Sequence, residues 1–251
     1  MKKGLKIFTK YYLIFCVYAL IGWLYEVLWM WFVVPPKKFI NRGVLLGPFL
    51  PIYGFGMIIL LVLLNKLMSK KHEINKPENY LIYIVTITTF TYTSIVEYTT
   101  TSKIYSVIEF IEKYGMGLIL VNIISIAVIY AISRLFSNKK IAKIDTTIIL
   151  VFLAIWIITT IIEYVSHFII DKYFHILLWD YTYDFLNINK RVNWDASRNF
   201  AIGGTFLLYT VQPLLNKYLP KIKENIQLKI TIILGTLMSL DFILHVILKI
   251  I

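Results

Sequence analysis

Four acidic side chains lie inside long apolar stretches of the sequence: Glu26, Glu97, Glu163 and Asp241. A charged residue at the centre of a membrane helix costs roughly 2.5–3.5 kcal/mol on insertion scales. At that cost, the carboxylates are expected to face the interior of a helix bundle or a water-filled cavity. There they could bind a cationic solute, relay protons or serve as a general acid or base. We predict that the four acids line an outward-facing cavity for substrate or proton handling.

Three of these acids recur in similar sequence surroundings. Residues 93–98 (Thr-Ser-Ile-Val-Glu-Tyr) match residues 159–164 (Thr-Thr-Ile-Ile-Glu-Tyr), and residues 21–26 form a looser third copy. The glutamates are 71 and 66 residues apart, about one helical hairpin each time. This spacing predicts duplicated hairpins that return each glutamate to the outer half of a membrane.

Polar side chains surround two of the glutamates at helical spacing. Hydroxyl residues lie three or four positions before and after Glu97, and Glu163 has similar neighbours, with His167 at i+4. We therefore add His167 to the predicted site. The competing interpretation is structural, with the acids protonated or held in ion pairs. The arginines expected to form such pairs are Arg42, Arg191 and Arg198.

The elements that carry these residues are apolar runs long enough to cross a bilayer. The chain has 251 residues, 59% of them hydrophobic, and a mean hydropathy of +0.73. About 20 helical residues span the hydrocarbon core. The fold class is therefore all-α, a polytopic transmembrane bundle of about seven helices that fills one membrane domain over residues 1–251. The predicted spans are 11–34, 48–68, 80–101, 115–136, 147–170, 200–216 and 229–249.

The distribution of charge predicts the location and the orientation. The net charge is +12, but the basic residues lie in short segments between apolar runs, which favours membrane lipids over nucleic acid as partners. Sixteen Lys and Arg fall on the side of the N-terminus and ten on the other side. This bias predicts a multi-pass protein of the cell membrane with a cytoplasmic N-terminus and an extracytoplasmic C-terminus.

Two connections have unusual compositions. Residues 41–56 contain four glycines and two prolines, which indicates irregular backbone before the second helix. Arg42 could bind a carboxylate or phosphate there. Residues 171–199 are rich in aromatic and charged side chains, which is typical of the membrane interface. We predict a structural loop made of Asn41, Gly43, Gly47, Pro48, Pro51, Tyr53 and Gly54.

These stretches resemble a known family. Residues 22–26, Asn41-Arg42-Gly43 and residues 47–56 are similar to the first block of the ABC-transporter type IV permease family (CmpB-like). Glu163-Tyr164, residues 179–181, Arg191 and residues 203–204 resemble its second block. Lys190 stands where the family pattern has glycine. The resemblance implies a bacterial permease. Asp180, which lies in the second block, and Arg191, which with Arg42 could orient an anionic part of a substrate, complete the predicted substrate-binding residues.

Three functions remain open from the sequence. The first is a transporter component, and since the chain has no Walker A motif, its ATPase would be a separate ATP-binding subunit. The second is an intramembrane enzyme acting on a lipid or lipid-linked substrate at the outer leaflet. Covalent catalysis has little support, because no nucleophile–base pattern is present, and transport or binding is favoured. The third is a membrane scaffold or sensor.

No cofactor and no metal are predicted, although one pair of residues has ligand spacing. Asp241 and His245 are at i, i+4 and could chelate a metal if His167 or His175 completed the site. Histidines in membrane helices are more often packed, hydrogen-bonded residues. The single cysteine, Cys16, excludes an intramolecular disulfide.

Overall fold

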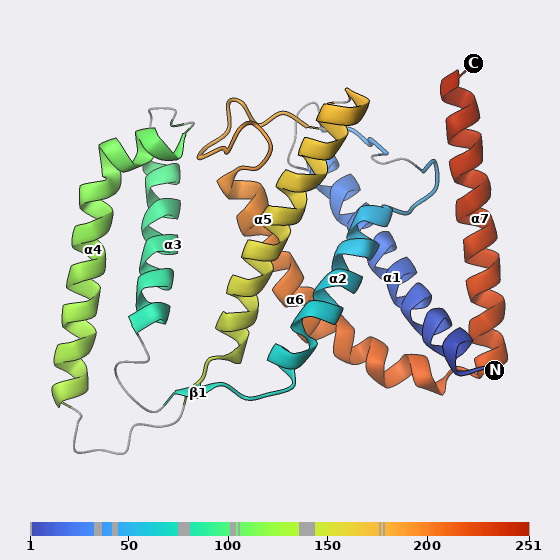
Figure 1. Cartoon of the computed structure of the whole chain (residues 1–251), viewed down its shortest axis with the longest axis horizontal. Helices are drawn as coiled ribbons and strands as arrows, with labels where there is room; N and C mark the ends of the chain where they lie inside the picture. The colour runs from blue at the N-terminus through green and yellow to red at the C-terminus, as the bar shows by residue number, and fades with distance from the viewer. Residues whose placement is uncertain are drawn as a thin grey trace. The chain divides into compact units, whose positions relative to one another are not determined.

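The computed structural model describes residues 2–32, 37–41, 45–74, 81–100, 104, 106–135, 144–175, 177 and 179–250. Arg42 and Gly43 of the predicted site lie outside these residues. Within them the chain forms seven α-helices, one 3-10 turn and two strands of two residues each (Figure 1). The elements are α1 (Lys3–Phe32), α2 (Pro51–Met68), β1 (Glu73–Ile74), α3 (Leu81–Thr99), α4 (Val107–Leu135), β2 (Ile144–Asp145), α5 (Thr147–Phe174), α6 (Trp194–Tyr218), η2 (Leu219–Lys221) and α7 (Glu224–Ile250).

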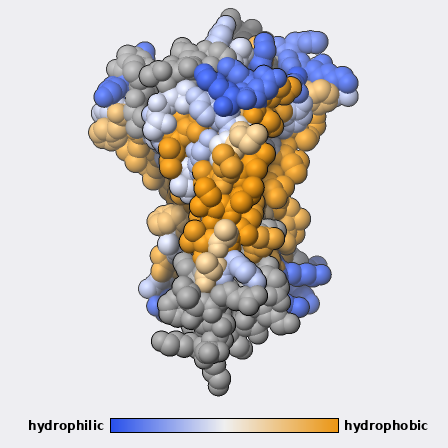
Figure 2. All heavy atoms as spheres, turned by 90° about the vertical axis from the view of Figure 1, so that its left-hand side faces the viewer, coloured by the Kyte–Doolittle hydropathy of each residue, from blue (hydrophilic) through white to orange (hydrophobic). Residues whose placement is uncertain are grey.

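The prediction of an all-helical membrane bundle is confirmed. Among the described residues, five helices are long and apolar enough to cross a membrane: α1, α2, α4, α5 and α7. Threonines and Glu97 lower the hydropathy of α3, and the polar first turns of α6 do the same for that helix. Exposed apolar side chains run along α4, from Ile108 to Tyr130 (Figure 2). Such a surface would be unstable in water and is the one that lipid requires.

Several helices begin earlier than predicted, because their polar first turns were assigned to loops. The N-terminus of α4 is capped by Ser106, whose hydroxyl accepts a hydrogen bond from the backbone N–H of Glu109 at 3.1 Å. The side chain of Asn193 caps α6 in the same way, through the backbone N–H of Ala196 at 2.7 Å. Both are standard helix starts, and hydropathy alone does not detect them.

The chain divides into two compact units, one formed by Met1–Asn65 with Phe206–Ile251 and the other by Lys66–Thr205. We call them unit 1 and unit 2. The single membrane domain over residues 1–251 and the hairpin repeat stay predictions. Unit 2 contains α3, α4, α5 and the first half of α6, and its two short strands pair antiparallel, with Glu73 opposite Asp145.

In unit 1, α1 packs against α7 and the two helices run in the same direction (Figure 1). The buried face of α1 includes Ile14, Cys16, Tyr18 and Ala19. The Tyr18 hydroxyl, which is buried, donates a hydrogen bond to Gln212 of α6 at 2.9 Å. These contacts make α1 the central helix of unit 1.

In unit 2, α3 and α4 form an antiparallel hairpin (Figure 1). A small hydrophobic core of Val96, Ile104 and Phe110 closes its loop end. A second aromatic cluster joins α3, α5 and α6, since Phe90 and Trp194 both pack edge-on against Trp156. The aromatic contacts fix the start of α6 against α5, where the candidate site lies.

Close helix packing in unit 1 depends on Gly22. A Cβ placed on Gly22 would overlap the Cβ and ring of Tyr53 in the first turn of α2. We expect Gly22→Ala to destabilise the protein by about 1–2 kcal/mol, because the overlap is close to the backbone and cannot be relieved by a rotamer change. Unfolding can be followed by a thiol-reactive dye, because Cys16 is the only cysteine and is buried.

Gly56 of α2 provides the matched control, because a Cβ there meets nothing within 4 Å. Gly56→Ala should be neutral or stabilising by up to about 1 kcal/mol through helix propensity. Equal effects of the two substitutions on the unfolding temperature would contradict the role given to Gly22.

Candidate functional site

Three titratable side chains lie on one stripe of α5 in unit 2. Glu163, His167 and Asp171 are spaced at i, i+4 and i+8, so they follow one another along the same face of the helix. Glu163 is 8% exposed and His167 only 2%. The helix ends at Phe174, after which His175 adopts a left-handed conformation with φ 54°. The stripe therefore occupies the last three turns of α5.

The connection between α5 and α6 folds back over this stripe. The backbone N–H of Tyr181 donates to the carbonyl of Lys190 at 3.0 Å, which closes residues 181–190 into a loop. The Tyr181 hydroxyl donates to Oε1 of Glu163 at 3.1 Å. The Trp179 ring stacks on the imidazole of His167, with centroids 5.2 Å apart. Residues 179–181 therefore cover both buried groups.

Arg191 lies at the end of the stripe nearest the helix terminus. Its guanidinium donates to Asp171 at 3.0 Å and lies over the rings of Phe168 and Tyr164, at 5.3 and 5.7 Å from their centroids. The Trp179 indole N–H donates to the Arg191 carbonyl at 2.8 Å. One aromatic side chain thus links His167 to Arg191, and the predicted residues Glu163, His167 and Arg191 belong to one cluster. We use the name α5 cluster for this group, which consists of Glu163, His167, Asp171, Trp179, Tyr181 and Arg191.

The α5 cluster contains buried polar atoms that make no hydrogen bond within the described part of the chain. They are Oε2 of Glu163, both ring nitrogens of His167 and Nε of Arg191. Leaving a buried polar group unpaired costs about 1–3 kcal/mol, so such groups are rare and need an explanation. Four such atoms lie in this one cluster, and for this reason we take it as the candidate site.

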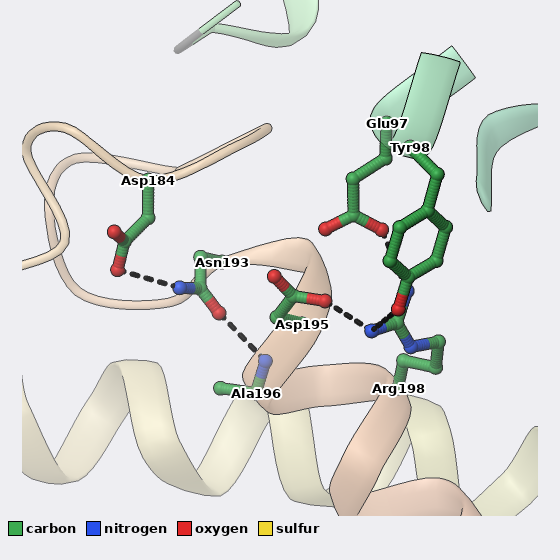
Figure 3. A network of polar contacts seen from close by, with 7 residues as sticks. All are labelled: Glu97, Tyr98, Asp184, Asn193, Asp195, Ala196 and Arg198. Carbon is green, nitrogen blue, oxygen red and sulfur yellow. Dashed lines mark hydrogen bonds and ion pairs between the residues drawn. The ribbon is translucent and has the colours of Figure 1, made fainter. Parts of the chain in front are cut away.

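A second polar cluster lies where α3 meets the start of α6 (Figure 3). Arg198 donates to Glu97 at 2.6 Å, and both side chains are 11% exposed. Arg198 also pairs with Asp195 and reaches the Tyr98 hydroxyl at 3.5 Å. Glu97 is therefore held in an ion pair, as the structural interpretation expects.

The same figure shows how the start of α6 is anchored. Asn193 donates to Asp184 at 2.8 Å with its amide nitrogen, while its amide oxygen accepts from Ala196 (Figure 3). Asn193 is 6% exposed, so both ends of its side chain need these partners. The loop before α6 is thereby fixed in place next to Arg198.

In unit 1, Glu26 and Asp241 each have a definite role. Glu26 accepts a hydrogen bond from the Tyr53 hydroxyl at 2.6 Å. The two oxygens of Asp241 accept the backbone N–H groups of Leu46 and Gly47, both at 2.7 Å. A Cβ on Gly47 would lie 2.9 Å from Asp241, so glycine permits this approach.

The predicted structural loop is held from both sides. Asn41 accepts from the Trp23 indole at 2.6 Å and donates to the Leu46 carbonyl at 2.7 Å. Pro48 lies in the bend that follows, and Pro51 is the first residue of α2, where a missing N–H costs nothing. Gly54 packs against Phe15 of α1.

Asp180 differs from the other predicted site residues. Its side chain is exposed and accepts hydrogen bonds from the hydroxyl and the backbone N–H of Thr182. These bonds hold the pKa of Asp180 below its ordinary value. Asp180 therefore stabilises the turn at 180–182.

No group of three or more His, Cys, Asp or Glu in the described ranges could hold a metal ion. The hypothesis of a site on Asp241 and His245 meets a further obstacle. Both Asp241 oxygens already accept backbone N–H groups.

Some residues of the two clusters were missed by sequence reasoning. Asp171 lies on the stripe of Glu163 and His167, and Asp195 is three residues before Arg198, so a search for i+3, i+4 and i+8 neighbours would have found both. Trp179 and Tyr181 were predicted to lie at the membrane interface. Their contacts with His167 and Glu163 depend on tertiary packing.

The loop over the α5 cluster carries a strained position. Lys190 has φ 64° and is exposed, a conformation that costs an L-residue about 1–2 kcal/mol and costs glycine nothing. We expect Lys190→Gly to stabilise the protein by about 0.5–1 kcal/mol, measured as a rise in the thermal unfolding midpoint followed by tryptophan fluorescence. Lys190→Ala removes the same side chain but keeps the Cβ, so it should give no gain. Equal shifts for both variants would refute the strain argument.

The comparisons with known proteins identify a family. A search of curated proteins finds no match, and a search of solved structures finds none either. A family model described as "Putative ABC-transporter type IV" matches residues 13–110 and 104–246, so that it covers nearly the whole chain and both polar clusters. The resemblance seen in the sequence is confirmed, and the chain belongs to the ABC-transporter type IV (CmpB) family.

Proposed function

We propose that the protein is the membrane-spanning component of a transporter and that the α5 cluster is its proton-handling site. The observation that carries the proposal is the pair Glu163 and His167, which are both buried on one face of α5 and both have polar atoms that make no hydrogen bond to the residues the structure describes. Chains of Glu, Asp and His inside membrane proteins commonly form proton relays. Membership of a transporter family supports the same conclusion.

Comparison among the four predicted acids favours Glu163 as the residue that gains and loses a proton. Glu97 is paired with Arg198, Glu26 accepts from Tyr53, and Asp241 accepts two backbone N–H groups. The Glu163 carboxylate receives a hydrogen bond on Oε1, while Oε2 is buried without a partner in the described residues. Oε2 is therefore the oxygen best suited to gain and lose a proton.

The surroundings of Glu163 support a specific division of roles. A proton on Oε2 has His167 one helical turn away, since residues at i and i+4 lie on adjacent turns of the same face. The Tyr181 hydroxyl orients the carboxylate, and the stacked Trp179 ring holds the imidazole plane. Arg191 and Asp171 neutralise each other, so Glu163 and His167 determine the charge of the cluster. Tyr181 and Trp179 are positioning residues in this scheme.

The wider arrangement is part of the same proposal. The chain forms one membrane domain in the cell membrane, with a cytoplasmic N-terminus and an extracytoplasmic C-terminus, as the bias of basic residues favours. With this orientation Glu163 lies in the outer half of the membrane. In this proposal ATP is bound by a separate subunit, since residues 1–251 contain no Walker A motif.

Proton flux into proteoliposomes tests the role of Glu163. Vesicles that contain the protein and an internal pH-sensitive dye should acidify faster than empty vesicles when a potassium diffusion potential drives cations inward. Glu163→Gln keeps the size and the hydrogen bond from Tyr181 but cannot exchange a proton. We expect it to lower the flux at least tenfold, to the level of empty vesicles.

An exposed acid supplies the control. Glu112 lies in the second turn of α4, and Glu112→Gln makes the same change of charge away from the α5 cluster. It should keep the wild-type flux. If Glu163→Gln protein inserts, folds and still conducts protons at the wild-type rate, the proposed role of Glu163 is wrong.

The transporter assignment has its own test. Affinity purification of the protein from its native membrane in mild detergent should recover a polypeptide with an ATP-binding cassette, together with vanadate-sensitive ATPase activity. Mass spectrometry of the eluate identifies such a partner. If no such polypeptide is found in eluates that contain intact protein, while proton flux is normal, the transporter assignment is wrong. The protein would then handle protons without an ATPase.

A further inference from the structure

One end of unit 1 carries a concentration of positive charge that the proposed function does not use. Six lysines lie there, on the first residues of α1 and on the turn between α6 and α7. The Lys6 ammonium pairs with Glu224 at 2.5 Å, which brings the beginnings of α1 and α7 together. Figure 1 shows the N-terminus beside the start of α7. The lysine cluster consists of Lys2, Lys3, Lys6, Lys217, Lys221 and Lys223.

The positive charge of the lysine cluster is almost uncompensated. Glu224 is the single acidic residue in 2–10 and 217–229, and Lys6 already pairs with it. The other five lysines are exposed. Cations held this close repel one another, and the repulsion is relieved only by a bound anion or by counter-ions from solution.

Two of these lysines make cation–π contacts with the same tyrosine. The ammonium groups of Lys217 and Lys221 both lie 5.3 Å from the ring centroid of Tyr218, which is 52% exposed. A tyrosine at this position is typical of the boundary between headgroups and acyl chains. Two ammonium groups on one exposed ring form a compact site for a phosphate group, since lysine binds phosphate as a point charge.

Apolar side chains lie directly beside the charged ones. Phe8 and Ile7 on α1 are 57% and 50% exposed, and Ile226 on α7 is 43% exposed. Both helices are long and apolar enough to span a membrane, and each begins at the lysine cluster. A ligand that fits this surface has a negatively charged head and a hydrocarbon tail alongside it. Soluble phosphates and nucleic acids have no part that would use the apolar side chains.

We infer that the lysine cluster is a binding site for anionic phospholipids, with the lipid phosphate held between lysines near Tyr218 and its acyl chains beside α1 and α7. Clusters of four to eight lysines next to a membrane helix attract anionic headgroups through their charge. Here Tyr218 and the ion pair between Lys6 and Glu224 add a defined geometry. The inference does not depend on proton handling by the α5 cluster.

The experiment measures lipid binding to the full-length protein in detergent. Native mass spectrometry counts bound dioleoylphosphatidylglycerol and dioleoylphosphatidylcholine over a titration at equal mole fraction. We expect phosphatidylglycerol to bind at least tenfold more tightly. The triple variant Lys217→Gln, Lys221→Gln and Lys223→Gln should lose about fivefold in affinity for each lysine removed. It leaves the ion pair between Lys6 and Glu224 intact.

A charge-matched variant distinguishes a local site from the net charge. Lys113, Lys172 and Lys190 are exposed lysines of unit 2, and their triple substitution by glutamine makes the same change of net charge. This control variant should bind phosphatidylglycerol as the wild type does. Thiol-dye unfolding through Cys16 verifies that both triple variants are folded before lipid is added.

Three outcomes would overturn the inference. One is equal binding of the two lipids by the wild type. Another is an equal loss in the two triple variants, which would show attraction to net charge without a site. The third is displacement of the lipid by millimolar inorganic phosphate or glycerol 3-phosphate, which would identify a free phosphate as the ligand.

Discussion

Inside a lipid bilayer a carboxylate cannot turn to water, so each buried acid must find its partner within the protein. The acids of this chain meet that requirement in different ways. Glu97 uses a guanidinium, Glu26 a phenol, and Asp241 two peptide N–H groups. Each partner comes from a different element from the acid itself, so the acids hold the segments of each unit together. Among the described residues, Glu163 has a partner for Oε1 only, the Tyr181 hydroxyl, while Oε2 is buried without one.

The two units contain the same arrangement of hydrogen bonds. In unit 1 a tyrosine on the segment after α1 donates to a glutamate of α1, and in unit 2 a tyrosine on the segment after α5 donates to a glutamate of α5. An asparagine in each connection donates to nearby backbone carbonyls, Asn41 in unit 1 and Asn187 in unit 2. The hairpin repeat itself stays a prediction, since Glu97, which lies in another copy of the repeated sequence, pairs with Arg198 instead. The difference lies in what surrounds the glutamate. Glu163 has a buried histidine one turn further along its helix, whereas the corresponding position after Glu26 is Met30.

Much of the fold could be predicted because a membrane limits the secondary structure that an apolar segment can adopt. Apolar runs of the right length can only be helices, and the runs located all seven. The predicted helix ends were less accurate. Capping residues such as Ser106 and Asn193 act through hydrogen-bond geometry, which hydropathy does not detect. The position of Glu163 and His167 on one face of a helix followed from their spacing. The contacts of Trp179 and Tyr181 could not be predicted, since they depend on how a loop of non-repetitive sequence folds over α5. The glycine expected at position 190 corresponds to a backbone with positive φ, where lysine is strained.

The threonine-rich composition of α3 has a consequence for how the protein is made. α3 is less apolar than the five described helices that are apolar enough to span a membrane, yet it packs against α4, which is one of those five. During synthesis α3 leaves the ribosome first and would partition poorly into lipid by itself. The hydroxyl of Tyr92 bonds to the Tyr114 carbonyl, and the amide of Asn122 bonds to Thr89, so α4 supplies polar partners that lipid lacks. Pairing with α4 therefore gives these polar groups partners that α3 alone would lack in lipid, which favours insertion of the two helices as a hairpin.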